Sequence, residues 1–344
     1  MKLTRRDRHD WRIFLWLSVT SAIVSAYFGY AVAPPDTPML RAFFSGVVNS
    51  VLIATPIFLF EIKSRRPGSL RRLRRLPLIQ YFGLKVLFYV AVIVGGLILA
   101  RVTVGTQDFH FDEMFRNSIV FAVAMAVFGN LMFEMGGLLG YGTLKNLLTG
   151  RYVQPKREQR AFLLIDMKDS TGLAERLGPV RFHELLNEFF RDVADAALEC
   201  EAEIHKYVGD EAILTWTDEA TLKGGDCLAC PFIAQGLIAR QSRGYIERFG
   251  IVPTFRAALH YGEIVAGEIG DVRREIAYVG DTLNVAARLL EAAKATGHNV
   301  LVSADLIGRA TLPSDLRATP LPTLTVRGRA QPLEIFALTR VGQN

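Results

Sequence analysis

Two aspartates, Asp166 and Asp210, stand where carboxylates could do metal chemistry. Asp166 ends the apolar run AFLLID, and Asp210 lies between two predicted strands, EIHKYV and EAILTW. If these strands lie side by side, the carboxylates converge on one point, which suits hard ions such as Mg²⁺ or Mn²⁺ that bridge to phosphates. From the pattern alone an alternative stays open, in which Asp166 caps a helix and Asp210 is a turn residue.

A polar segment directly after Asp166 is suited to binding phosphate. The sequence MKDSTGLAE places Ser170 and Thr171 at a loop and the beginning of a helix, where backbone N–H groups can bind a polyphosphate. Further along, Asn284 and Arg288 are four residues apart and share one face of a predicted helix. An amide beside a guanidinium can stabilise charge on a phosphate, although a surface ion pair explains Arg288 equally well.

The string YVGD occurs twice, at 207–210 and at 278–281. The first copy leads from a strand into a two-residue hairpin, so we expect Asp210 at the hairpin tip. The second copy leads from a strand into a helix, and Asp281 stands at the expected N-cap position. The two aspartates therefore need different explanations.

The elements that must position these residues alternate between helix and strand. Helices are expected from Pro179, over about 226–248 and over 281–297. Strands are expected at 161–166, 203–208, 211–216, 254–262, 263–270, 299–303, 323–328 and 333–339. This alternation, with a hairpin in it, indicates an α+β fold in which helices cover a sheet with a ferredoxin-like βαββαβ core.

Apolar residues concentrate in the first 144 residues. Four apolar stretches there are each long enough to cross a bilayer as a helix, and they lie near 12–33, 42–62, 78–100 and 118–140. Basic residues gather before the first stretch, between the second and third, and after the fourth. By the positive-inside rule this charge pattern predicts a multi-pass protein of the inner or plasma membrane with both termini in the cytoplasm. A cleavable signal peptide at the first stretch is the weaker alternative, because its apolar run is longer than a typical signal core.

Two polar residues, Asn130 and Glu134, lie one turn apart inside the fourth apolar stretch. Polar groups at such positions usually face the interior of a helix bundle. They indicate either helix packing or a sensing site, and the sequence leaves both open.

The chain resembles the class III nucleotidyl cyclases over about 158–340. The matching motifs, in the order of that family, are FLLIDMKDSTGLAERLG, IHKYVGDEAILTW, LHYGEIVAGEIG, YVGDTLNVAARL and TVRGRAQPLEIFAL. Members convert ATP or GTP to the 3′,5′-cyclic monophosphate and pyrophosphate. Five ordered motifs are a specific signal.

The resemblance implies metal-binding and catalytic roles. Asp166 and Asp210, with the carbonyl of Met167, would hold two Mg²⁺ or Mn²⁺ ions that bridge the triphosphate. Asn284 would orient the ribose, and Arg288 would stabilise the transition state. In this family the metal aspartates of one chain and the other catalytic residues of a second chain complete each site, so the resemblance implies a homodimer.

The resemblance also implies substrate contacts. Lys206 matches a lysine that reads adenine, and the segment with Ser170 and Thr171 would hold phosphate. Arg327 stands where a lysine usually grips the terminal phosphates. Ala277 occupies the second purine-reading position, and its side chain cannot accept a hydrogen bond from the base. ATP is still favoured over GTP, because guanylate cyclases usually carry Glu at the position of Lys206.

These patterns together divide the chain into three parts. They are a four-helix transmembrane domain at 1–144, a cytoplasmic linker at 145–160 and a class III cyclase domain at 161–340. The basic surplus, a net charge of +6, is explained by membrane topology and gives no reason to expect nucleic acid as a partner. Cys227 and Cys230 have no second pair of ligands nearby, so two buried residues one turn apart are the simpler interpretation.

The expected function is that of a membrane-anchored adenylate cyclase regulated through its membrane domain. Alternatives are a cyclase with relaxed ATP and GTP selectivity, and a non-catalytic membrane receptor that binds nucleotide, which Ala277 and Asp169 would suit. Asp169 departs from the family because a carboxylate beside the phosphate loop repels triphosphate unless it caps the helix and points away. A diguanylate cyclase is disfavoured, because the hairpin reads VGDE without the Gly-Gly pair expected there.

Overall fold

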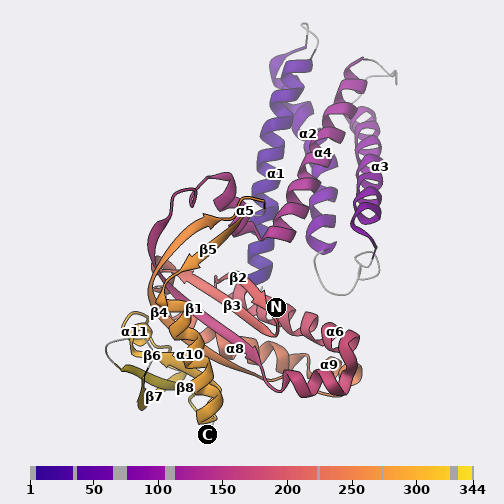
Figure 1. The fold of residues 1–344 in the computed structure, drawn as a ribbon. Coiled ribbons are helices and arrows are strands. Elements are labelled where there is room, and N and C mark those ends of the chain that lie inside the picture. The colour runs from indigo at the N-terminus through magenta and orange to yellow at the C-terminus, as the bar shows by residue number, and fades with distance from the viewer. Residues whose placement is uncertain are drawn as a thin grey trace. The chain divides into compact units, whose positions relative to one another are not determined.

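The computed structural model describes residues 5–33, 37–64, 76–104, 113–222, 225–272, 274–325 and 332–342. The chain forms two compact units, Met1–Leu139 and Gly140–Asn344 (Figure 1). Each unit has buried apolar clusters of its own, one in the N-terminal unit and two in the C-terminal unit.

The N-terminal unit consists of four long helices in its described residues. They are α1 (Arg5–Val32), α2 (Met39–Ser64), α3 (Leu78–Val104) and α4 (Glu113–Leu139). Each contains an apolar stretch of 21 to 24 residues, which at ~1.5 Å per residue reaches across the ~30 Å hydrocarbon layer of a bilayer. The four expected apolar helices are therefore confirmed. The connections at 34–36, 65–75 and 105–112 lie outside the described residues, so the orientation remains a prediction.

Helices α1 and α2 approach each other through small residues. A Cβ atom on Gly46 would overlap the carbonyl oxygen of Ser25, and one on Gly29 would lie 2.7 Å from the carbonyl oxygen of Ala42. The hydroxyl of Ser50 also donates to Ser21 across the two helices at 3.0 Å. Small residues and hydroxyl pairs of this kind favour close helix packing in a membrane.

An ion-pair cluster joins α2, α3 and α4. The ammonium of Lys85 on α3 lies 2.5 Å from a carboxylate oxygen of Glu61 on α2 and 2.9 Å from one of Glu134 on α4. Tyr89 donates a hydrogen bond to Glu61, and both Lys85 and Glu61 are almost fully buried. One ammonium thus bridges two carboxylates from neighbouring helices.

Glu134 therefore faces other helices, as expected, through its ion pair with Lys85. One turn away, Asn130 is buried, and its amide oxygen and nitrogen have no hydrogen-bond partner among the described residues. Their burial fits the bundle interior, and the choice between a packing and a sensing role remains open.

The C-terminal unit is built on one eight-stranded sheet in its described residues. The strands are β1 (Lys156–Met167), β2 (Glu203–Val208), β3 (Glu211–Thr217), β4 (Phe255–Ile269), β5 (Glu275–Val279), β6 (Val300–Ser303), β7 (Leu316–Leu324) and β8 (Leu333–Arg340). Their order is β2-β3-β1-β4-β6-β8-β7, with β5 paired to β4. The antiparallel set β2-β3-β1-β4 has the ferredoxin-like order, which confirms the expected α+β class and core.

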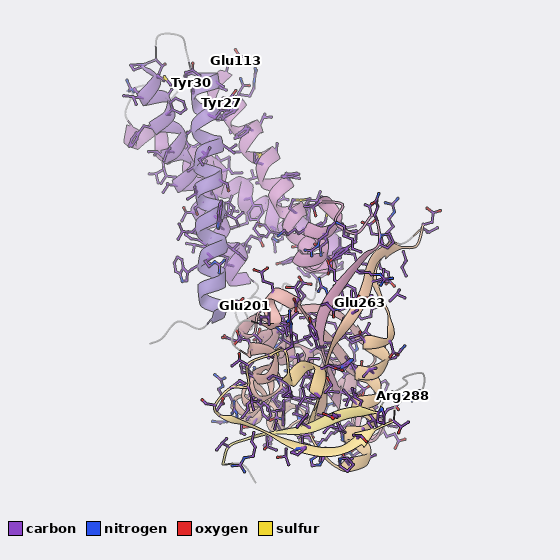
Figure 2. All side chains as sticks on the ribbon, turned by 90° about the vertical axis from the view of Figure 1, so that its left-hand side faces the viewer. Tyr27, Tyr30, Glu113, Glu201, Glu263 and Arg288 are labelled. Carbon is purple, nitrogen blue, oxygen red and sulfur yellow. The ribbon has the colours of Figure 1, made fainter. Side chains whose placement is uncertain are left out.

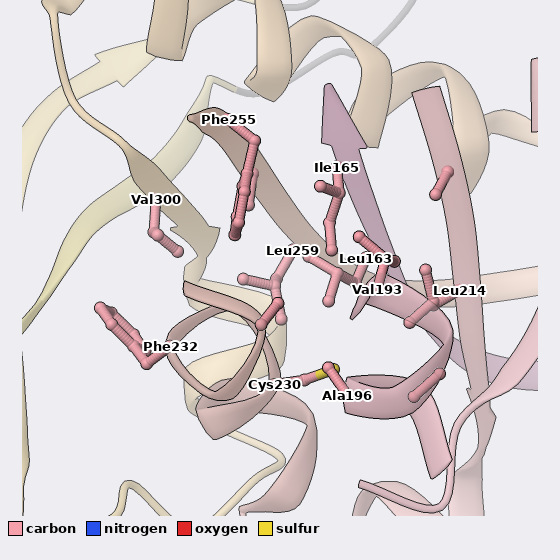
Figure 3. Close-up of a cluster of buried hydrophobic side chains, with 14 of the residues drawn as sticks. Leu163, Ile165, Val193, Ala196, Leu214, Cys230, Phe232, Phe255, Leu259 and Val300 are labelled. Carbon is pink, nitrogen blue, oxygen red and sulfur yellow. The ribbon is translucent and has the colours of Figure 1, made fainter. Parts of the chain in front are cut away.

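Helices cover both faces of this sheet. One face packs against α6 (Ser170–Glu199), α8 (Asp226–Arg240) and α9 (Ser242–Phe249), and the other against α10 (Asp281–Thr296). The alternation of β1 sorts its side chains: Leu163 and Ile165 join the α6 side, and Phe162 and Leu164 join the α10 side. Figure 3 shows Leu163 and Ile165 among side chains of the first cluster.

The three cysteines belong to this first cluster. Cys200, Cys227 and Cys230 are all buried and unpaired, and Figure 3 shows Cys230 close to Ala196 of α6. The expected burial of Cys227 and Cys230 is confirmed. All three side chains pack among apolar residues between α6, α8 and the sheet.

Several element boundaries differ from the sequence-based expectation. β1 begins at Lys156, and the expected linker at 145–160 includes part of α5 (Tyr141–Leu148) and the first residues of this strand. α6 begins at Ser170 rather than at Pro179, and Gly178 with φ of 73° forms a kink directly before that proline. The helix expected over 226–248 is divided at Gln241 into α8 and α9. Two short helices, α7 (Asp218–Thr221) and α11 (Ala304–Ile307), and helix α5 were not expected.

The two strands expected at 254–262 and 263–270 form one continuous strand, β4. Its glycines serve close packing rather than a break: a Cβ atom on Gly262 would lie 2.7 Å from the hydroxyl oxygen of Thr282, and one on Gly267 would lie 3.3 Å from Pro155. The strand expected at 323–328 also differs, because β7 covers Leu316–Leu324. The rest of that expected strand extends into residues 326–331, which lie outside the described residues.

We expect Lys85→Met to destabilise the N-terminal unit by about 3–5 kcal/mol, because it leaves the buried carboxylate of Glu61 and the partly buried carboxylate of Glu134 without their shared cation. The measurement is thermal unfolding of the detergent-purified full chain, followed by helical circular dichroism. The matched control is Arg116→Met, which removes an ion pair with Glu113 in which both side chains are mostly exposed, and should change stability by under about 1 kcal/mol. Equal effects of the two substitutions would contradict the prediction.

Candidate active site

The two aspartates meet where β1 ends beside the β2–β3 hairpin. In the strand pairing Asp166 lies opposite Glu211, so the hairpin tip at Gly209 and Asp210 is next to the end of β1. The backbone N–H of Met167 donates to the carbonyl oxygen of Asp210 at 3.3 Å. Gly209 has φ of 62°, a left-handed conformation that favours glycine in this tight turn. The turn thus brings the two carboxyl groups within interaction distance.

A lysine from α10 neutralises part of this negative charge. The ammonium of Lys294 lies 3.0 Å from a carboxylate oxygen of Asp166, whose side chain is largely buried. Burial raises the pKa of the Asp166 carboxyl and neighbouring Asp210 raises it too, while Lys294 opposes both effects. Burial and the charges of Asp166 and Asp210 likewise raise the pKa of Glu211 to about 7.

This arrangement fits a divalent cation. Asp166 and Asp210 supply carboxylate oxygens on one point, the backbone of Met167 runs beside them, and a cationic ammonium already sits on Asp166. Two carboxylates leave coordination positions for phosphate oxygens, which is how Mg²⁺ is usually bound at sites that process nucleotides. The ammonium of Lys294 shows that a cation is accommodated beside Asp166.

The phosphate-loop candidates lie at the N-terminus of α6. Ser170 is half-buried and Thr171 is exposed in the first turn, directly after Asp169. Asp169 occupies the N-cap position of α6 with φ of 56°, but its side chain makes no capping hydrogen bond. Its carboxylate pairs instead with Arg176 at 3.2 Å, which offsets the negative charge beside this helix end.

The second YVGD leads into α10, but the N-cap lies one residue earlier than expected. Gly280, with φ of 149°, is the N-cap and Asp281 is the first helical residue, so Asp281 is not the cap. The hydroxyl of Thr282 ties this helix end to β4 by donating to the carbonyl oxygen of Glu263 at 2.6 Å. A glycine is required at the cap because its backbone conformation is one that other residues rarely adopt.

Asn284 and Arg288 are both exposed on α10. The guanidinium of Arg288 lies 2.7 Å from a carboxylate oxygen of Glu291, and Figure 2 shows Arg288 at the periphery of the C-terminal unit. A hollow of about 460 Å³ beside it is lined by Arg288, Glu291, Ala292, Ala295, Leu324 and Thr325. Arg288 thus forms the surface ion pair that was the alternative interpretation of this residue, and its side chain remains exposed.

The two purine-reading candidates lie on β2 and β5. Lys206 is exposed on β2, and its ammonium is 3.9 Å from a carboxylate oxygen of Glu275, at the beginning of β5. Ala277 lies two residues further along β5, opposite Gly267 of β4. The structure therefore brings these two candidates near each other. Arg327 lies outside the described residues.

Within one chain the candidates form separate groups. Lys294 and Arg288 are both on α10, but six residues turn a helix by roughly 240°, so they leave it in different directions. Lys294 contacts Asp166 of the aspartate pair, whereas the hollow beside Arg288 is lined by neither aspartate nor by Lys206. One chain thus presents the aspartate pair and the exposed face with Asn284 and Arg288 at different places.

Two residues of the site escaped the sequence analysis. Lys294 was missed because a lysine in the last turn of a helix is common and nothing local indicates a partner more than a hundred residues away. Glu211 adjoins Asp210 in the sequence, and that adjacency was a usable signal for a third carboxylate near the pair.

Comparison with known proteins defines the class. The family sequence model for the adenylate and guanylate cyclase catalytic domain matches residues 153–340 of this chain. A solved bacterial light-regulated adenylyl cyclase superposes with a TM-score of 0.53 over 67% of this chain and 66% of that chain, at 16% identity, which shows a shared fold. The chain belongs to the adenylate and guanylate cyclase catalytic domain family.

Two similar relatives come from Rhizobium meliloti (strain 1021). Adenylate cyclase 2 is 35% identical over 301 residues, which cover 86% of this chain and 83% of that protein. Adenylate cyclase 1 is 25% identical over 190 residues, covering 54% of this chain and 28% of that protein. The first similarity is too long to be confined to the cyclase domain and extends into the helical unit.

We expect Lys294→Met to tighten binding of Mn²⁺ by roughly two- to fivefold, because the cation no longer displaces an ammonium from Asp166. The measurement is isothermal titration of the purified full chain with Mn²⁺ in the absence of nucleotide. The control is Lys168→Met, which removes a charge near the same strand end without an ion pair to Asp166. Weaker Mn²⁺ binding in Lys294→Met would show that Lys294 supports the ion rather than competing with it.

Proposed function

We propose that this protein is a membrane-anchored adenylate cyclase that converts ATP to 3′,5′-cyclic AMP and pyrophosphate. The observation that carries the proposal is the meeting of Asp166 and Asp210 at a cation position in a domain of the cyclase family. The similarity to an adenylate cyclase over 86% of the chain supports both the activity and the pairing of cyclase domain with apolar helices.

Asp166, Asp210 and the carbonyl of Met167 are the residues that would hold divalent ions, two in each site. When bound, these ions supply positive charge to the triphosphate and lower the pKa of the ribose 3′ hydroxyl. The ammonium of Lys294, which lies on Asp166 in this structure, would then have to move away from that carboxylate. The backbone N–H groups of the first turn of α6 are suited to the phosphates.

The remaining residues act on the reacting nucleotide. Asn284 orients the ribose, so that the 3′ oxygen attacks the α-phosphorus in line with the departing pyrophosphate. Arg288 stabilises the negative charge that develops on the α-phosphate, which requires its exchange from Glu291 to the substrate. Arg327 is assigned to the terminal phosphates by resemblance alone.

Each active site is proposed to form between two chains. The support is the separation, within one chain, of the aspartate pair from the exposed face that carries Asn284 and Arg288. Two chains related by a two-fold axis would bring the aspartates of each opposite the Arg288 of the other, giving two equivalent sites.

Base selectivity is proposed to favour ATP without excluding GTP. Lys206 is the one charged reader, and Ala277 offers no side-chain acceptor for the adenine amino group. A site that lacks one hydrogen bond to the base discriminates less, because the wrong base leaves fewer polar groups unpaired. Relaxed selectivity is therefore the second candidate, and Ala277 is the observation that favours it.

The four apolar helices are proposed to form a membrane domain at 1–144, joined by residues 145–160 to a cytoplasmic cyclase domain at 161–340. Both termini are placed in the cytoplasm by the distribution of Lys and Arg. One helix would suffice as an anchor, so four apolar helices, three of them joined by an ion-pair cluster, favour an additional regulatory role for this unit.

The proposal predicts that the full chain in detergent forms cyclic AMP from ATP with Mn²⁺. Asp210→Asn and Arg288→Ala should each lose about 100-fold or more in kcat, because each removes charge stabilisation from the transition state. Asp281→Asn should stay near the unmodified rate, since Asp281 only begins a helix. Bound nucleotide without any cyclic product would favour a receptor, and a dinucleotide product would favour a diguanylate cyclase.

Co-expression of Asp210→Asn with Arg288→Ala tests the shared site. Random pairing puts half of the dimers in mixed form, each with one intact site of two, so about a quarter of the unmodified activity should return. The control is Asp210→Asn co-expressed with Asp166→Asn, where both defects fall in the same half of the site and no activity should return. Failure of the first mixture to exceed the second would place all catalytic residues of a site in one chain.

A further inference from the structure

The two purine-reading candidates lie on strands that do not pair. Lys206 is on β2, which pairs with β3 at the edge of the sheet. Ala277 is on β5, which pairs with residues 265–269 at the C-terminal end of β4. Backbone hydrogen bonds therefore do not set the spacing between them. Something else must hold β2 and β5 at a constant separation if both are to meet one base.

Side chains next to the two candidates supply that connection. His205 directly precedes Lys206, and Tyr278 directly follows Ala277. Their rings stack with centroids 4.4 Å apart and planes at 25°. The register of β2 against β3 shifts between Ile204 and Lys206, so His205 occupies a bulge, a device that re-aims side chains at the end of a strand.

A buried arginine lies beneath Tyr278. The guanidinium carbon of Arg160 on β1 is 5.0 Å from the centre of the Tyr278 ring, and this arginine is 0% exposed. The edge of the same tyrosine ring packs against Phe162 at 5.8 Å and 69°. His205, Tyr278 and Arg160 thus form a column, and burial lowers the pKa of His205 to about 4, which keeps its imidazole neutral next to that cation.

Arg160, at one end of the column, is held by hydrogen bonds to three side chains. Arg160 donates to Glu158 at 3.0 Å, to Glu203 at 2.9 Å and to the hydroxyl of Tyr152 at 3.1 Å. Glu203 belongs to β2, so Arg160 contacts β2 through this carboxylate and β5 through Tyr278. A buried, fully bonded arginine is costly to desolvate and keeps its neighbours in one arrangement.

We propose that the column of His205, Tyr278 and Arg160 positions Lys206 and the backbone around Ala277, and thereby sets how strongly the site prefers one purine over the other. These are positioning residues, since they act through the candidates beside them. The inference rests on the proposed function, and it follows from the missing acceptor at Ala277. With no side-chain acceptor there, selectivity depends on where Lys206 and the β5 carbonyl groups lie, and the column determines both.

The test compares Tyr278→Leu with Tyr278→Phe in the full chain. Tyr278→Phe keeps the ring and should leave the ratio of kcat/KM for ATP to that for GTP near the unmodified value. Tyr278→Leu removes the ring between His205 and Arg160 and should lower this ratio roughly three- to tenfold, the worth of one hydrogen bond, mainly through a higher KM for ATP. The packing control is Phe249→Leu, which trims another buried aromatic of this unit. It should lower stability and leave the ratio unchanged.

Two further readouts separate failure of this inference from failure of the proposed function. Equilibrium binding of ATP and GTP gives the same selectivity ratio without turnover, so a chain that binds nucleotide but makes no cyclic product refutes the function and still tests the column. NMR titration of His205 should show its pKa rising toward about 6.5 in Tyr278→Leu but not in Tyr278→Phe. An unchanged selectivity in Tyr278→Leu, or no nucleotide binding at all, overturns the inference.

Discussion

The antiparallel pairing of β1 with β4 is the constraint on which the C-terminal unit depends. It runs from Lys156 opposite Ala266 to Met167 opposite Phe255 without a shift in register. Because side chains alternate along a strand, Arg160 and Asp166 fall on the same face, roughly 20 Å apart. One strand thereby sets both the place of the Asp166 carboxylate, proposed to bind metal, and that of Arg160, which contacts Tyr278 beside the purine-reading candidates. A one-residue slip would put both charges on the apolar α6 side.

Much of this arrangement was predictable where the signal is local. The strand ending in Asp166, the hairpin at Asp210 and the helix with Asn284 and Arg288 all follow from periodicity and turn residues, and resemblance supplied their roles. The apolar helices were equally clear, because length and composition suffice. Boundaries failed where a distant contact decides: Gly262 reads as a break, yet it is small because Thr282 approaches it. Lys294 and Arg160 escaped because a single basic residue does not identify its partners.

Both units use the same electrostatic device. In the helical unit Lys85 is placed between Glu61 and Glu134, and in the cyclase domain Arg160 is placed between Glu158 and Glu203. In each case a buried cation joins segments that come from different elements. Such clusters add little net stability, because desolvation offsets much of the Coulomb energy. They instead restrict the number of alternative packings, which matters where helices or strands must keep fixed positions relative to each other.

The ammonium of Lys294 on Asp166 affects the charge that an incoming metal ion would meet. In the proposed function a divalent ion would exchange with this tethered cation and would not meet bare, mutually repelling carboxylates. The net gain in charge would then be one unit rather than two, which would keep the affinity modest and let the ion depart with its product. Lys294 already balances the charge of Asp166 in the folded domain, so the domain would keep the same shape before the ion binds and after it leaves.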